Sequence, residues 1–266
     1  MQGRLSPKEA QNLQSFPQVD WRLEFARAKS VGFDSIEWLY DVHCGAVNPL
    51  LTDAGREEIK ACIASTGVTV SSACAHAFVD GSLSWQRDAI DDLLALIQSC
   101  GSIDIERLVF PLLEGGAVSS RPEWVEFRNV LKPALDCCVG HNVLMCLETD
   151  VPAGELLRWL SASPHPNLRV CYDVGNAVAR GGDPVEELNL IADYVAEIHI
   201  KDRKIGGSTY PLGEGDTDFG SVVEWLHRSD CAYPIIFETP VGSDWHSSAT
   251  SNFEFMARRF AGMKAV

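Results

Sequence analysis

Positive charge is scarce in this sequence of 266 residues. Its 22 lysines and arginines stand against 37 aspartates and glutamates, which gives a formal net charge of −15. A surface of that sign repels nucleic acid and anionic membranes, because binding to either depends on lysines and arginines that neutralise phosphates. We therefore expect no nucleic-acid partner and no membrane partner. A small phosphorylated substrate is not excluded, since one local pocket of cations or backbone amides can hold it.

Long apolar runs and cysteine pairs at metal-binding spacing are also missing. No stretch reaches the roughly 18 apolar residues of a membrane-spanning helix, and the N-terminus lacks the charged-then-apolar pattern of a signal peptide. The nine cysteines are odd in number, include no Cys-x-x-Cys motif and lie mostly within apolar runs. They indicate buried free thiols in a reducing compartment, not disulfides or a zinc knuckle. We expect a cytoplasmic protein.

What the sequence does contain is a regular alternation of short apolar runs and amphipathic segments. The clearest unit spans residues 170–202, where two strand-like runs flank a Gly/Pro-containing turn and a helical segment. The alternation predicts strands at 1–5, 33–39, 68–74, 107–112, 142–148, 168–172, 195–198 and 234–238. It predicts helices at 20–30, 53–65, 84–100, 122–139, 153–161, 184–194, 219–227 and 248–260. Gly140 is expected to end the helix at 122–139, and the Gly-rich residues 203–217 are expected to form a loop.

Eight strand–helix units of this kind fit either a doubly wound sheet or a closed (β/α)8 TIM barrel, both α/β folds. Such a barrel typically takes about 250 residues, so eight units within 266 residues favour it. No linker or low-complexity segment divides the chain, and we expect a single domain over residues 1–266. The first strand is the least clearly marked of the eight in the sequence, because residues 1–5 are short for a barrel strand.

Parallel barrels place their chemistry at the carboxyl ends of the strands. In this sequence the charged or imidazole side chains near such ends are Glu37, His76, Glu114, Glu148, Asp173, His199 and Glu238. A lone carboxylate at such a position is often a helix cap or an ion-pair partner, so one alone indicates little.

Four consecutive strand ends carry Glu148, Asp173, His199 and Glu238. Three carboxylates crowded at one mouth repel one another unless a cation lies between them. Together with one imidazole they form an oxygen-rich ligand set that suits Mn²⁺, Mg²⁺ or Co²⁺, with Zn²⁺ also open. The sequence therefore predicts a site for one divalent metal ion, and a polar network without metal is the alternative.

The segments around these residues resemble a known superfamily. CLETD, YDVGN, EIHIKD, GEGDTDFG and FETP, with GRL near the start and GFDSIEW, are similar to parts of the xylose-isomerase-like sugar isomerase/epimerase superfamily. Within it the chain looks most like the 3-epimerases of ketopentuloses and of their 5-phosphates, including the L-xylulose/L-ribulose 5-phosphate type. The resemblance spans nearly the whole chain and implies the same barrel.

The resemblance also implies a reaction and its residues. The family's metal ligands fall on Glu148, Asp173, His199 and Glu238, and the two glutamates double as the acid/base pair. The implied reaction is 3-epimerisation of a ketopentulose or its 5-phosphate through a metal-bound cis-enediolate. Moving a proton at the carbon beside a ketone needs a base on one face and an acid on the other, which two glutamates roughly half a barrel apart can supply.

Two further residues are candidates for contact with substrate hydroxyls. Glu37 matches a glutamate that has this role in the family, and a salt bridge is the alternative. His76 is a candidate hydroxyl donor, and a rim histidine held by the protein is the alternative.

Three residues after Asp173 the sequence departs from many relatives, which carry a histidine where this chain has Asn176. The sugar-phosphate branch has the same DxGN pattern, and the amide of Asn176 can hydrogen-bond a hydroxyl. Lys201 and Arg203 are candidates for substrate contact that can stabilise enolate charge or bind a phosphate, and solvated loop residues are the alternative. Asp202 is expected to be a solvated loop residue.

Several other functions remain open at this stage. Aldose–ketose isomerases and dehydratases of the inosose or dehydroshikimate type share the superfamily and its chemistry. A DNA-repair endonuclease of the same barrel needs more histidine and aspartate ligands and a basic face, and the net charge argues against it. A sugar-binding barrel without catalysis is disfavoured because both glutamates are present. The resemblance leaves a homodimer open.

Overall fold

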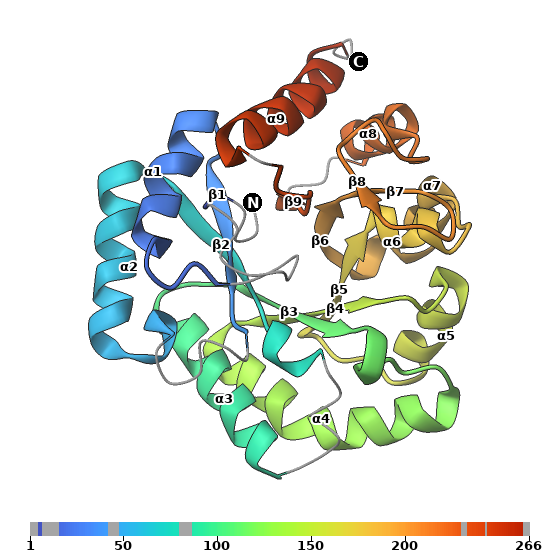
Figure 1. The fold of residues 1–266 in the computed structure, drawn as a ribbon. Helices are drawn as coiled ribbons and strands as arrows, with labels where there is room; N and C mark the ends of the chain where they lie inside the picture. The colour runs from blue at the N-terminus through green and yellow to red at the C-terminus, as the bar shows by residue number, and fades with distance from the viewer. Residues whose placement is uncertain are drawn as a thin grey trace.

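Seven parallel strands form a nearly closed barrel in the computed structural model of the chain (Figure 1). The structure describes residues 5–6, 16–41, 48–79, 87–229, 233–242 and 244–262. The strands are β1 (Ser35–Leu39), β2 (Thr69–Cys74), β3 (Arg107–Leu112), β4 (Leu144–Thr149), β5 (Leu168–Asp173), β6 (Val195–Ile200) and β9 (Ile235–Phe237). Each pairs in parallel with the next along the chain.

This strand order decides between the two expected folds. A doubly wound sheet reverses its order at a switch point, whereas these strands follow one another without reversal. The (β/α)8 TIM barrel is confirmed, and the doubly wound alternative is wrong. The strand expected at 1–5 lies outside the described residues except for Leu5, which is fully buried.

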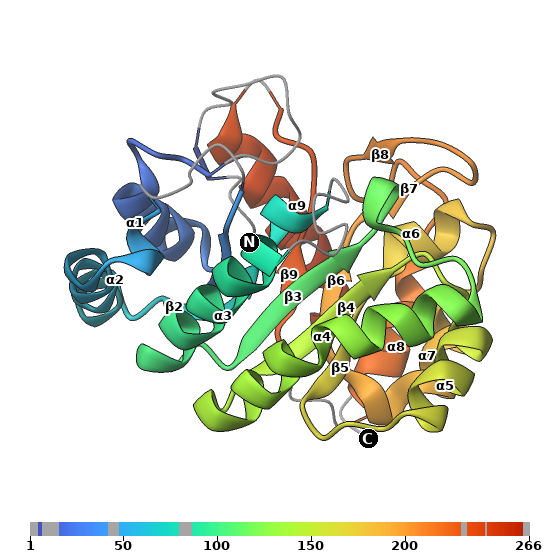
Figure 2. The same cartoon turned by 90° about the horizontal axis from the view of Figure 1, so that it is seen from below.

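Helices surround the strands and cover the outside of the barrel (Figure 2). They are α1 (Trp21–Val31), α2 (Asp53–Thr66), α3 (Arg87–Ser102), α4 (Arg121–His141), α5 (Ala153–Ala162), α6 (Val174–Ala179), α7 (Pro184–Ile191), α8 (Phe219–Arg228) and α9 (Trp245–Ala261). Short 3₁₀ turns are η2 (Pro49–Leu51), η3 (His76–Phe78), η4 (Glu114–Gly116) and η5 (Ala192–Tyr194). Among the described residues, none of the helices combines the length and apolar character that crossing a bilayer requires.

Helix ends follow the local chemistry, with one exception to the sequence prediction. The side chain of Thr52 accepts the Gly55 N–H and so caps α2, and Gly67 ends that helix in the left-handed conformation. Gly140, however, does not end α4. The helix continues to His141, and Asn142 adopts the left-handed conformation with φ of 57°. Asparagine tolerates this region better than most residues, so α4 can end at Asn142 without a glycine.

The region between β5 and α8 contains more structure than the sequence pattern indicated. The turn after β5 forms the short helix α6, because the Asp173 side chain accepts the Asn176 N–H and caps its first turn. The expected loop at 203–217 contains two short antiparallel strands, β7 (Asp202–Arg203) and β8 (Thr209–Tyr210). In Figure 1 this hairpin lies beside α6.

A buried carboxyl group ties the N-terminal segment to α1. Glu24 is 4% exposed, and its oxygens accept the Leu5 N–H at 3.3 Å and the Ser6 hydroxyl. Burial raises the pKa of Glu24 from 4.5 to about 7, although the contact with Ser6 works against this. The folded protein therefore holds a proton on Glu24 that the unfolded chain has released near neutral pH.

The raised pKa of Glu24 predicts how the free energy of unfolding depends on pH. Because the folded-state pKa is the higher one, the free energy of unfolding falls as the pH rises from about 4.5 to about 7, by roughly 3 kcal/mol. We expect Glu24→Gln, which keeps an acceptor for Leu5 and Ser6, to remove this fall. Urea unfolding at pH 5, 6, 7 and 8 measures it. Parallel pH dependences of the two proteins would contradict the assignment.

Candidate metal centre

Four side chains meet at the carboxyl ends of β4, β5, β6 and β9. Asp173 is the last residue of β5, and Glu238 directly follows β9. Glu148 and His199 each lie one residue before the end of their strands, and His199 is in register with Asp173. One ligand atom from each residue lies within 4.8 Å of the others, and all four residues are buried. The structure thus brings together the four residues around which the sequence predicts a metal site.

The carboxyl groups of this cluster lie so close together that their surroundings favour the protonated form of some of them. Burial, and next the neighbouring Glu238, raise the pKa of Glu148 to about 8. Burial also raises the pKa of Asp173, although the Lys201 ammonium works against this. Both shifts follow from packing carboxyl groups together away from water. A divalent cation among them would favour their ionised forms.

The donor set fits a divalent metal ion. Three carboxylates and one imidazole offer hard oxygen and borderline nitrogen ligands, which Mn²⁺, Mg²⁺, Co²⁺ and Zn²⁺ all accept. Their spacing within 4.8 Å of one another suits donors around a single ion. The cluster is therefore a buried acidic and histidine site that could bind one metal ion.

Lys201 supplies positive charge to the same cluster. Its Nζ lies 2.8 Å from Asp173 Oδ2 and 2.8 Å from Glu238 Oε2. Although burial alone lowers the pKa of a lysine, these two carboxylates raise that of Lys201 above its usual value. Its stem crosses α6 at Gly175, where a Cβ atom would lie 2.8 Å from Lys201 Cβ. The glycine of the DVGN segment therefore makes room for the lysine.

Asn176 and Arg203 form a chain of contacts that ends on Glu148. The Asn176 amide donates from Nδ2 to Glu148 Oε1 at 3.1 Å, and its Oδ1 accepts from Arg203 Nη1 at 2.9 Å. Arg203 also donates to the Gly207 carbonyl from Nε and Nη2. The structure thus places both residues at the cluster, where Asn176 orients a cluster carboxyl group and Arg203 orients Asn176.

The remaining strand-end candidates lie in different surroundings. Glu37 is 2% exposed, and its Oε2 lies 3.4 Å from His199 Nε2 and accepts from Ser72 Oγ. His76 is half-buried and begins η3, directly beyond β2. Glu114 is exposed in η4 and does not belong to the four-residue cluster.

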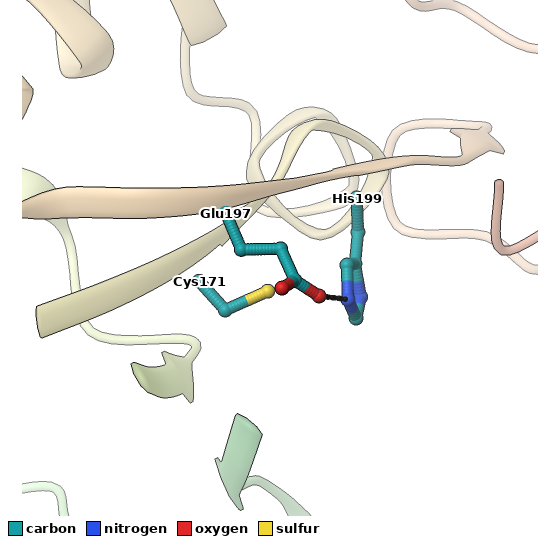
Figure 3. Close-up of side chains that lie close together, drawn as sticks. All are labelled: Cys171, Glu197 and His199. Atoms are coloured by element: carbon teal, nitrogen blue, oxygen red, sulfur yellow. Dashed lines mark hydrogen bonds and ion pairs between the residues drawn. The ribbon is translucent and has the colours of Figure 1, made fainter. Parts of the chain in front are cut away.

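Glu197 is a buried residue beside His199. It was not among the predicted site residues, because only side chains near the carboxyl ends of strands were considered. It lies in the middle of β6, is 0% exposed, and its Oε1 lies 3.4 Å from His199 Nε2. Figure 3 shows its carboxyl group between the Cys171 thiol and the His199 ring. Side chains two residues apart on a strand share a face, so the alternation of Glu197, His199 and Lys201 was a usable signal.

Asp202 corrects the prediction of a solvated loop residue. It is 0% exposed, and its carboxylate accepts the backbone N–H groups of Gly213 at 2.8 Å, Gly215 at 2.8 Å and Thr217 at 3.2 Å. A carboxylate that accepts several N–H bonds can be buried at low cost. Asp202 therefore folds the Gly-rich segment back onto the end of β6.

Two glycines allow this packing. Gly213 has φ of 93°, a conformation that side chains disfavour. At Gly215 a Cβ atom would lie 2.1 Å from Asp202 Oδ1, so any larger residue would push the carboxylate away. Gly213 is thus explained by its backbone conformation, and Gly215 by its close approach to Asp202.

The fold and the cluster define a barrel enzyme whose buried, potentially metal-binding site lies at the carboxyl ends of its strands. The chain belongs to the Xylose isomerase-like TIM barrel family, whose model matches residues 25–259. This confirms the superfamily that the sequence motifs resemble.

Individual relatives indicate which kinds of enzyme this chain is similar to. L-ribulose-5-phosphate 3-epimerase UlaE of Salmonella typhimurium (strain LT2) is 27% identical over 233 residues, covering 82% of this chain and 81% of that protein. A xylose isomerase domain protein from Planctomyces limnophilus has a TM-score of 0.78 at 18% identity, covering 94% of both chains. A structure of L-ribulose 3-epimerase has a TM-score of 0.74 at 18% identity, covering 97% of this chain and 92% of that one. Two of these three relatives are named epimerases, and the chain is an enzyme of the isomerase class.

Removing the lysine tests whether its ammonium balances the cluster. We expect Lys201→Met to destabilise the metal-free protein by about 3 kcal/mol, because buried carboxylates lose their ion pair. We expect the same change to tighten Mn²⁺ binding about tenfold, since a positive charge that repels the ion is removed from beside Asp173 and Glu238. Urea unfolding and calorimetric Mn²⁺ titration measure the two effects.

The matched control for this prediction is Lys204→Met. Lys204 is half exposed, and its Nζ lies 3.5 Å from Asp216 Oδ1, on the loop away from the cluster. Neither property is expected to change appreciably in this variant. Equal Mn²⁺ affinities in Lys201→Met and wild type would show that the lysine does not compete with the ion.

Proposed function

We propose that this protein is a divalent-metal-dependent 3-epimerase that acts on a ketopentulose or its 5-phosphate. The observation that carries the proposal is the meeting of Glu148 and Glu238 with Asp173 and His199 in one buried cluster. The two glutamates come from β4 and from the end of β9, which are not neighbours in the sheet. They are therefore able to approach a bound sugar from different sides.

In the proposed reaction the two glutamates exchange a proton with the carbon beside the ketone. One carboxylate removes the proton from one face, and the other carboxyl group returns a proton to the opposite face, which inverts C3. A bound divalent ion would polarise the carbonyl and stabilise the negative charge that develops on the sugar oxygens. The cluster residues would hold the ion through three carboxylates and the imidazole.

The surroundings of the two glutamates differ in the way that such a proton exchange needs. Glu148 Oε1 accepts a hydrogen bond from the neutral amide of Asn176 at 3.1 Å. Glu238 faces the Lys201 ammonium at 2.8 Å, which stabilises negative charge on its carboxylate. We assign Glu238 as the first base and Glu148 as the first acid for one direction of the reaction, with the roles exchanged for the reverse.

The proposed substrate contacts follow from the positions of the remaining candidates. Lys201 would stabilise the charge on the enediolate, and His76 and Asn176 would bind hydroxyls at the mouth. Arg203 would hold the Asn176 side chain in place at the mouth, and it would also bind the phosphate group of a phosphorylated substrate. Glu37, which is fully buried beside His199, would act on the substrate only through that histidine. The named activity of the Salmonella relative favours a pentulose 5-phosphate.

Proton exchange with solvent tests the proposal. The protein, loaded with Mn²⁺, is incubated in D₂O with a panel of ketopentuloses and their 5-phosphates. Deuterium at C3 together with the C3 epimer is the expected result. An aldose product would instead identify an aldose–ketose isomerase, and an ultraviolet-absorbing product formed by loss of water would identify a dehydratase. Exchange that needs no metal would contradict the metal dependence.

A further inference from the structure

Beneath the proposed metal centre lies a second layer of buried polar side chains. Glu37, Ser72, Glu197 and Cys171 surround the inner side of His199, and each is at most 2% exposed. Replacing a buried carboxyl group by an apolar side chain of similar size is often favourable for folding. Two carboxyl groups at this depth therefore call for an explanation other than stability.

The two nitrogens of His199 face different partners. Nδ1 lies 3.2 Å from Glu238 Oε2 and so faces the metal cluster. Nε2 lies 3.4 Å from Glu197 Oε1 and 3.4 Å from Glu37 Oε2, on the inner side. A neutral imidazole carries one N–H and one free lone pair, so binding a cation through Nδ1 requires the proton on Nε2.

Glu197 is the better placed acceptor for that proton. Its contact with His199 Nε2 meets the criteria of a hydrogen bond, and Figure 3 shows it as a dashed line. Ser72 Oγ lies 2.9 Å from the same Oε1 atom, closer than its 3.2 Å to Glu37 Oε2. The Ser72 hydroxyl thus fixes the oxygen that receives the imidazole N–H.

We propose that Glu197 is a positioning residue of the metal centre, which selects the Nε2–H tautomer of His199 and so directs the Nδ1 lone pair at the ion. The inference rests on the proposed function, because it needs a metal ion in the cluster. Carboxylates that accept the second N–H of a metal-binding histidine commonly contribute 10–100-fold to metal affinity. Glu37 is a second carboxyl group next to His199 Nε2, but its contact does not have the alignment of a hydrogen bond.

Mn²⁺ affinity in matched variants tests the role of Glu197. Glu197→Leu removes the acceptor, and calorimetric titration is expected to show Mn²⁺ binding about 10–100-fold weaker than in wild type. Glu197→Gln keeps an acceptor oxygen and is expected to stay within about threefold of wild type. Glu24→Leu removes another buried carboxyl group, whose contacts are with Leu5 and Ser6, and is expected to leave Mn²⁺ affinity unchanged.

The tautomer itself gives a readout that a purely structural role would not change. Nitrogen-15 NMR of the Zn²⁺-loaded protein, with His199→Gln used to assign the signal, is expected to show the proton on Nε2 in wild type and in Glu197→Gln. Wild-type Mn²⁺ affinity in Glu197→Leu, or a proton on Nδ1 in the loaded wild type, would overturn the inference alone. A wild-type protein that binds no Mn²⁺ would overturn the proposed function as well.

Discussion

Glu148→Gln and Glu238→Gln are each expected to lower kcat/KM for epimerisation by about 10³–10⁴-fold. Each change leaves the side-chain shape but removes a group that takes up or donates the proton at C3. Each also weakens one carboxylate contact to the ion, so the assays are run at saturating Mn²⁺. Deuterium exchange at C3, measured in both variants, reports the loss of proton transfer directly.

The matched control for these variants is Glu114→Gln. Glu114 is also a strand-end glutamate, but it is exposed and lies outside the cluster, so activity within about twofold of wild type is expected. Circular dichroism of all three variants checks that the barrel is retained. Wild-type rates in both cluster variants would remove Glu148 and Glu238 from the acid/base roles.

Removal of the metal ion is expected to have an effect of similar size. Dialysis against a chelator should lower turnover by 10³-fold or more, because the substrate oxygens lose the charge that stabilises the enediolate. The barrel should stay folded, since the Lys201 ammonium remains 2.8 Å from Asp173 and Glu238. Adding Mn²⁺ back should restore turnover.

Thermal unfolding gives a second measure of the same ion. At a free concentration of about 100 times Kd, a bound metal adds roughly 2.7 kcal/mol and raises Tm by about 5–10 °C for a domain of this size. Asp173→Asn, which removes one oxygen ligand, should show a smaller rise. Full activity in thoroughly metal-free protein would contradict the metal requirement.

The barrel could be predicted from sequence because it depends on patterns that repeat. Apolar runs alternate with amphipathic helices along the whole chain, and parallel strands bring their carboxyl ends together whatever their spacing. For this reason Asp173 and Glu238, which are 65 positions apart in the sequence, were expected to meet. Their meeting needs only the fold, not the details of the loops.

The features that were missed depend on individual contacts. Asp202 was expected in water because it follows a strand in a polar segment, but its carboxylate accepts three backbone N–H groups that no sequence pattern specifies. Glu197 was passed over because it lies inside a strand, where a carboxyl group is uncommon. Gly140 was expected to end its helix, whereas α4 continues to His141 and ends at Asn142 in the left-handed conformation.

The way in which Asp202 holds the segment before α8 bears on how the sequence of that segment can change. The turn at residues 213–217 takes its shape from backbone N–H groups that donate to Asp202, so it depends on two glycines and one carboxylate and not on the side chain of Glu214. The exposed side chain of Glu214 is thus free to vary without unfolding this turn. Selection can therefore change the residue at this position while the backbone of the turn, and its anchor at the end of β6, stay the same.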